Sequence, residues 1–262
     1  VVADDEVQLA VFEEDAPRGR WLPLFGGELP QEPVARKAAK PDLEVVAPLP
    51  PRDAWPAGAL LLLSSGSAPP RRSGALAPLD PRGGLSGPAW TFDLGPLYEQ
   101  LAAELEAAVN VEGAALFDDR LVLLHRGTAQ KRSALVEVDL GRLVEAASER
   151  GAVSANSIRD LREVLLPEVS GWPLAFTDGI SLPDGTIAFT AVAEQTDDPV
   201  RDAACVGSAV GRVSRGGKVL AVELLQGAPK VEGLCLRGKE AWLVTDADDP
   251  SAPAQLLSVA LP

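Results

Sequence analysis

Apolar residues along this chain occur in pairs of short runs, and a few turn residues join the two runs of each pair. Three pairs share one pattern: an acidic residue, a small residue, an apolar run, a turn and a second apolar run. They occupy residues 110–116 with 120–125, 176–182 with 186–191, and 230–236 with 240–246. A looser copy occupies residues 42–49 and 59–64, with a longer proline-rich turn and Val45 where the others have glycine. This pattern predicts β-hairpins.

Two further candidate strands follow two of these hairpins. Residues 134–139 and 158–165 follow one, and residues 208–213 and 219–224 follow the next. Their near alternation of apolar and polar residues is typical of half-buried strands. Repeated units of four antiparallel strands predict an all-β fold, specifically a β-propeller of four-stranded blades.

The two ends of the chain resemble each other. Residues 243–246 and 255–260 align with residues 1–4 and 7–12, so the first unit begins at its second strand. We therefore expect a single domain, residues 1–262, with five blades and an incomplete N-terminal blade; a sixth blade would need a further repeat. Residues 1–5 should form a strand within a blade, and residues 254–261 should lie in the last blade or close the ring.

Two stretches interrupt the strand pattern. Residues 96–108 and 141–150 place Leu and Ala at helical spacing, with Glu on the opposite face. They predict two short helical insertions on blade loops.

The composition is that of a soluble globular protein, with 46% hydrophobic and 24% charged residues. The formal net charge of −14 argues against nucleic acid or an anionic membrane as partner, because both would repel this surface. We expect the ligand to be a small molecule or a cation bound in the channel, and we expect the protein to be a monomer. No run of 18 apolar residues occurs, and Cys205 and Cys235 are too few for a disulfide scaffold. The compartment, cytoplasmic or periplasmic, stays open.

Four acidic residues recur near the starts of the first strands: Glu44, Glu112, Asp178 and Glu232. Innermost strands of a propeller line its channel, so we expect these carboxylates to converge at one mouth. Two unit charges about 4 Å apart at an effective dielectric near 20 repel by about 4 kcal/mol. Such a ring needs a bound cation, nearby Arg or Lys, raised pKa values or water.

Two interpretations of the acids remain open. Each carboxylate accepts backbone N–H groups of the adjacent blade, or the four hold a divalent cation, for which Ca²⁺ with its several oxygen ligands is the best candidate. A zinc cluster is disfavoured because the chain has one His and two widely separated Cys. His125 ends a second strand and Arg126 follows it, and these two are the candidate catalytic residues. The alternative is that His125 has a structural role and that Arg126 offsets the charge of the acids.

The chain resembles bacterial propeller proteins related to the phytase-like or esterase-like propeller family. The motifs that carry the resemblance are Lys40-Pro41-Asp42-Leu43-Glu44, Asn110-Val111-Glu112-Gly113, Leu124-His125-Arg126-Gly127, Phe176-Thr177-Asp178-Gly179 and Val231-Glu232-Gly233. More distantly, calcium-dependent lactonase propellers also place an acid-Gly pair at the start of an innermost strand. The resemblance implies a propeller and a channel cation; it does not imply phytate hydrolysis.

Two functions follow from these observations. The first is a calcium-supported hydrolase, an esterase, lactonase or phosphoesterase, in which the cation polarises the substrate oxygen and His125 or a carboxylate acts as base. The alternative is a non-catalytic propeller that binds a ligand or a protein.

Overall fold

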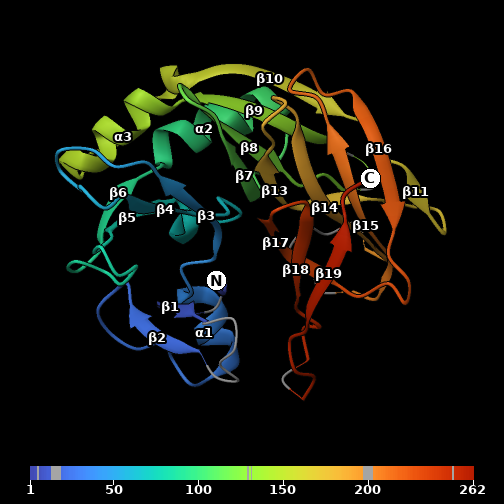
Figure 1. The fold of residues 1–262 in the computed structure, drawn as a ribbon, viewed down its shortest axis with the longest axis horizontal. Helices are drawn as coiled ribbons and strands as arrows, with labels where there is room; N and C mark the ends of the chain where they lie inside the picture. Colours follow the sequence, from blue (N-terminus) through green and yellow to red (C-terminus); the bar gives the residue numbers. More distant parts are fainter. Residues whose placement is uncertain (5, 13–18, 129, 131, 197–202, 250) are drawn as a thin grey trace. The chain divides into compact units, whose positions relative to one another are not determined.

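The computed structural model describes residues 1–262 apart from 5, 13–18, 129, 131, 197–202 and 250. The chain divides into two compact units. Unit 1 consists of Val1–Val111 and Asp139–Ser157, and unit 2 consists of Glu112–Val138 and Ile158–Pro262. Figure 1 shows the elements of each unit.

Unit 1 contains one four-stranded antiparallel sheet. Its order is β3 (Leu43–Leu49), β4 (Ala59–Ser64), β5 (Ser73–Pro78) and β6 (Trp90–Asp93). The apolar strand β4 is buried almost throughout, as expected for a strand with neighbours on both sides. The unit also contains a two-stranded ribbon of β1 (Gln8–Val11) and β2 (Arg20–Pro23), and the 3₁₀ turns Pro69–Arg71 and Ala155–Ser157.

Both predicted helices are confirmed and belong to unit 1: α2 (Gly95–Leu105) and α3 (Leu140–Glu149). Helix α3 begins after Asp139, whose Oδ1 accepts a hydrogen bond from the backbone N–H of Arg142 at 2.9 Å. The indole N–H of Trp90 donates to the carbonyl of Ala147 at 2.8 Å and ties α3 to β6. The helices are therefore packed parts of the unit, with buried apolar faces, and not loose decorations.

The sequence pattern missed a third helix, α1 (Pro33–Ala39). It is short and exposed, so it lacks the apolar stripe that reveals an amphipathic helix. The Glu32 carboxylate caps it by accepting hydrogen bonds from the backbone N–H groups of Val34 and Ala35, at 3.0 and 2.7 Å.

Unit 2 contains three larger sheets, each with its strands in sequence order. The first is β7 (Val111–Leu116), β8 (Arg120–His125), β9 (Ser133–Asp139) and β10 (Ile158–Val164); the second is β13 (Ala175–Ser181), β14 (Ile187–Glu194), β15 (Cys205–Val213) and β16 (Val219–Leu224); the third is β17 (Val231–Arg237), β18 (Glu240–Thr245) and β19 (Leu256–Ala260). A small ribbon of β11 (Glu168–Val169) and β12 (Trp172–Pro173) lies between the first two in sequence. The predicted hairpins and the further strands after two of them are confirmed.

The number of blades is a correction to the sequence analysis. The described residues form an all-β fold of the propeller class with four blades and three helices, so the expectation of five blades, with six as the upper count, is wrong. Three blades have four strands, and the last has three.

The error came from the N-terminal segment. Val1–Asp4 forms no strand, and Asp5 lies outside the described residues. Among those residues β1 pairs only with β2, outside any blade. Val1 instead lies beside Ala10: its terminal ammonium donates to the Ala10 carbonyl at 2.9 Å, and the Ala10 N–H donates back at 3.0 Å. At the other end, β19 pairs with β18, which confirms that residues 254–261 belong to the last blade.

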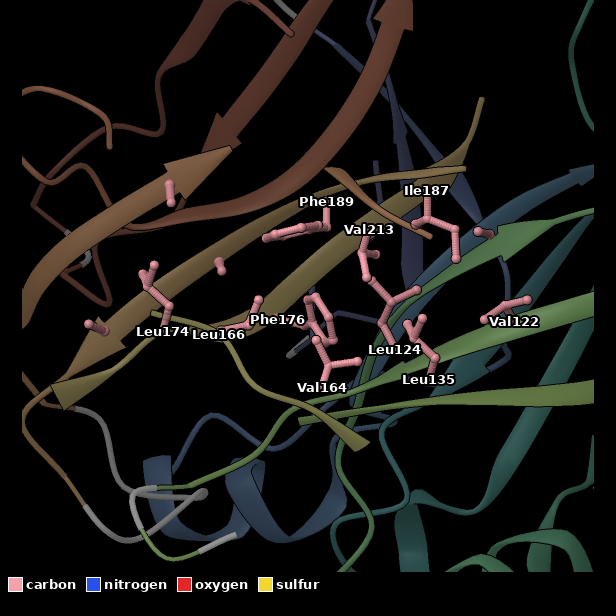
Figure 2. Close-up of a cluster of buried hydrophobic side chains, with 14 residues drawn as sticks. Val122, Leu124, Leu135, Val164, Leu166, Leu174, Phe176, Ile187, Phe189 and Val213 are labelled. Carbon is pink, nitrogen blue, oxygen red and sulfur yellow. The ribbon is translucent and has the colours of Figure 1, made fainter. Parts of the chain in front are cut away.

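A hydrophobic core of unit 2 lies between its first two sheets. Figure 2 shows side chains from both sheets meeting there, among them Leu124, Leu135, Phe176 and Phe189. The Phe176 and Phe189 rings contact edge to face, with centroids 5.1 Å apart. This core fixes the strands whose ends carry the acidic residues.

Candidate functional site

The first strands of three blades share a β-bulge near their start. The register against the second strand shifts between Leu43 and Val45, between Phe176 and Asp178, and between Val231 and Gly233. The extra residues are therefore Glu44, Thr177 and Glu232. By register, the residue equivalent to Glu232 is Thr177 and not Asp178. The alignment of repeats that matched Asp178 with Glu232 was therefore wrong by one residue.

Asp178 joins the first strands of two blades. Its Oδ2 accepts a hydrogen bond from the backbone N–H of Leu234 in β17, and its Oδ1 accepts one from the N–H of Gly179, both at 2.7 Å. On its other side β7 approaches closely, because a Cβ at Gly113 would lie 2.7 Å from the Asp178 Cα. Asp178 thus accepts a backbone N–H group of the neighbouring blade, which is the first of the two roles that the sequence left open for the acids.

Burial raises the pKa of Asp178 to about 7, against the lowering effect of the two N–H groups, and the Glu112 carboxylate adds to the rise. The group therefore changes charge near neutral pH.

Lys230, directly before β17, lies among three carboxylates from different segments. Its Nζ is 3.5 Å from Glu194 Oε1 at the end of β14 and 3.4 Å from Glu232 Oε1 in β17. It also donates a hydrogen bond to Asp248 in the loop after β18. Burial alone would lower the pKa of Lys230, but the carboxylates of Glu232, Asp248 and Glu194 hold it above its ordinary value. Lys230 is therefore a charged ammonium group on a side chain that is 14% exposed.

Arg126, directly after β8, is the second cation of this region. Its guanidinium lies 3.5 Å from Glu112 Oε1 and 2.6 Å from Glu194 Oε2. Glu194 thus connects the two cations, with one oxygen toward Arg126 and the other toward Lys230. We name this group of side chains the Lys230 cluster: Glu112, Arg126, Glu194, Lys230, Glu232 and Asp248.

The cluster has more carboxylates than cations, four against two. Burial raises the pKa of Glu232; the charges of Arg126 and Lys230 oppose the rise, and those of Glu112 and Glu194 increase it. An additional positive charge beside Glu232 would favour its ionised form.

Two buried oxygens in the cluster, Glu194 Oε1 and Glu232 Oε1, have no hydrogen-bond partner among the residues that the structure describes. Both face Lys230, but at distances longer than a good N–H···O bond. The Glu194 side chain is 10% exposed, so bulk water does not compensate it. Buried polar atoms ordinarily have partners, and such exceptions mark positions for an additional donor or cation.

Glu44 lies in unit 1 and has different neighbours. Among the described residues, Asp4, Asp42 and Glu44 form the acidic group that brings one oxygen from each of three side chains within 4.8 Å of one another. The ammonium of Lys40 already contacts Asp4 and Asp42 there. Burial would lower the pKa of Lys40, yet these two carboxylates raise it.

The serine-rich segment after β4 contacts Asp42. Ser65 and Ser67 donate hydroxyl hydrogen bonds to Asp42 Oδ2, and Arg71 donates to the same oxygen at 3.1 Å. These donors already have an anionic partner within the chain, so Asp42 is a structural carboxylate.

His125 ends β8 and is 2% exposed. This burial favours a structural role over contact with a substrate. The two cysteines, Cys205 and Cys235, are free thiols.

Sequence reasoning found Glu112, Arg126 and Glu232 in this region from their repeat positions. It assigned no role to Lys230 or Asp248. Two signals were available in the sequence: Lys230 directly precedes a strand that begins with an acid-Gly pair, and Glu194 ends a second strand.

Comparisons with known proteins identify a family but no activity. The profile described as "Family of unknown function (DUF6910)" matches residues 36–250. A search of curated proteins found no significant match. The described residues contain no helix long and apolar enough to span a membrane.

Solved structures show only remote likeness. A luciferin-regenerating enzyme aligns with 12% identity and a TM-score of 0.39 over 82% of this chain and 60% of its own. The hydrazine synthase of Kuenenia stuttgartiensis aligns with 12% identity and a TM-score of 0.36 over 84% of this chain and 63% of its own. The chain thus covers less than two thirds of either protein, and at these scores neither likeness bears on function.

Proposed function

Because this chain belongs to a family of unknown function (DUF6910), we propose its function from the site itself: the Lys230 cluster binds a basic group of a small molecule. The observation that carries the proposal is a pair of buried carboxylate oxygens, Glu194 Oε1 and Glu232 Oε1, to which no group in the described part of the chain donates a hydrogen bond. An ammonium or amidinium group of a ligand would donate to both. The protein is then a ligand-binding protein, with no catalytic step required.

Charge supports this proposal. Four carboxylates and two cations leave the cluster short of positive charge when all groups are ionised. The chain's net charge of −14 also raises the local concentration of small cations. A ligand amine would supply both the missing charge and the missing donors.

Melting temperatures in the presence of 1,4-diaminobutane test the proposal. The wild type should gain stability with diamine concentration, beyond the effect of NaCl at equal ionic strength, because a ligand bound only by the folded state raises the free energy of unfolding by about 2.7 kcal/mol at 100 times its Kd. Glu194→Gln should reduce the rise, since it removes a charge from the binding position. Glu163→Gln, at a side chain 62% exposed on β10, should leave it unchanged.

A wild type that responds to the diamine no more than to NaCl would show the proposal to be wrong. An equal response in Glu194→Gln would place the binding elsewhere.

Calcium-supported hydrolysis is the second candidate, and the same two oxygens favour it because carboxylates are the ligands that Ca²⁺ prefers. Glu112 and Glu232 would supply further oxygens, with Arg126 beside them. Against it, Lys230 and Arg126 would repel a divalent ion at this position.

A CaCl₂ titration of the melting temperature separates the two candidates. The calcium hypothesis requires a rise in the wild type that MgCl₂ does not reproduce and that Glu112→Gln weakens. A response to the diamine without a response to CaCl₂ would exclude it.

A further inference from the structure

Lys230 is held in place by its own turn. Gly227 and Ala228, which precede it, have φ values of 78° and 46°, so two consecutive residues adopt the left-handed conformation. Such a conformation is costly for alanine and persists where surrounding contacts impose it. One such contact is the hydroxyl of Ser208 in β15, which donates a hydrogen bond to the Pro229 carbonyl. The turn therefore presents the Lys230 side chain to the cluster.

The ammonium of Lys230 lies between an outer and an inner set of acceptors. It makes its hydrogen bond to Asp248, whose side chain is 32% exposed. Toward the interior it approaches Glu194 and Glu232 at 3.5 and 3.4 Å, close enough for charge attraction but not for good hydrogen bonds. The inner oxygens are thus neutralised in part, while their hydrogen-bonding capacity stays unused.

We infer that Lys230 is an internal competitor for the ligand's basic group, and that the ligand replaces its ammonium beside Glu194 and Glu232 while that ammonium keeps its hydrogen bond to Asp248. This inference rests on the proposed function. Without ligand, Lys230 lies beside Glu232 and offsets the charge of Glu194. With ligand, Asp248 retains the displaced ammonium, so Lys230 sets how strongly a basic group must bind to enter.

Lys230→Met tests the inference, because it removes the charge and keeps a side chain of similar length. Binding of 1,4-diaminobutane should become about tenfold tighter than in the wild type, the scale expected when one directly interacting charge is removed. Lys230→Arg, which keeps the charge, should show no gain. Diamine binding that is equal or weaker in Lys230→Met would overturn the inference.

Asp248→Asn provides a second, independent variant. Asn tolerates the left-handed backbone of this position, where φ is 52°. Without the carboxylate, the displaced ammonium loses its outer partner, so diamine binding should weaken several-fold. Unchanged diamine binding in Asp248→Asn would overturn the inference. This test remains decisive if Lys230→Met does not fold.

The two proposals fail in different ways. If neither the wild type nor Lys230→Met responds to the diamine, the proposed function is wrong and the inference falls with it. If the wild type responds and Lys230→Met gains nothing, only the competitor role of Lys230 is wrong.

Discussion

The backbone N–H of Leu234 donates a 2.7 Å hydrogen bond to the carboxylate of Asp178, and this bond joins the first strands of two consecutive blades, β13 and β17. Glu232 stands two residues before Leu234, so Asp178 also fixes the strand that carries one acid of the Lys230 cluster. Asp178 therefore supports the site without belonging to its ion pairs.

Asp178 should make stability depend on pH. The pKa of Asp178 is raised to about 7 in the folded chain, against about 3.9 in an unfolded chain. Between these values the folded state binds more protons. Protonated Asp178 therefore contributes up to about 4 kcal/mol to the free energy of unfolding. This contribution is complete below about pH 4 and is lost as the pH rises to about 7.

Urea unfolding at pH 5 and pH 8 measures this contribution. Asp178→Asn cannot titrate, so the stability of the wild type relative to this variant should be greater at pH 5 than at pH 8. Asp118→Asn, at an exposed turn residue, should keep the pH dependence of the wild type. The difference in the free energy of unfolding between the wild type and Asp178→Asn could also be the same at both pH values. That result would show that Asp178 does not titrate in this range.

Gly113→Ala should destabilise the protein by about 1–3 kcal/mol, the usual cost of an added methyl group in a packed site. The new Cβ would lie 2.7 Å from the Asp178 Cα, which is backbone and cannot rotate away. Gly233→Ala is the matched control, because it occupies the same acid-Gly motif but its nearest contact is Val244 Cβ at 3.6 Å. Equal melting temperatures for the two variants would contradict the close approach of β7 to β13.

Local signals in the sequence predicted most of the blade strands. Turn residues such as Asp184 and Gly185 mark a hairpin directly, and the apolar runs on either side need no distant information. The blade count failed because it depended on a short likeness between the chain ends. Whether residues 1–4 join a sheet is decided by nonlocal pairing, which in the structure leads Val1 to Ala10.

The site was predictable only in part for the same reason. Repeat position locates Glu112 and Glu232. The strand register places Asp178 one residue beyond the equivalent of Glu232, and this offset leaves no mark in the residue types. Lys230 and Asp248 belong to loops, whose paths no periodicity describes. Pairing of a cation with three separate carboxylates is therefore a result of the fold.

Arg126→Gln should be among the most destabilising substitutions of a charged residue in unit 2. It leaves Glu112 and Glu194, both about nine-tenths buried, without the guanidinium that lies 3.5 and 2.6 Å from them. Removing one partner of a buried ion pair costs about 3–5 kcal/mol, because the other charge stays desolvated.

Arg132→Gln is the control, since Arg132 and Glu163 form an ion pair at 3.4 Å with side chains 59% and 62% exposed. Such surface pairs contribute about 0–1 kcal/mol, so this variant should melt close to the wild type. Urea unfolding of the wild type and the two variants measures both losses in the free energy of unfolding. A small loss in Arg126→Gln would mean that Arg126 does not compensate Glu112 and Glu194, and the charge balance of the Lys230 cluster would have to be revised.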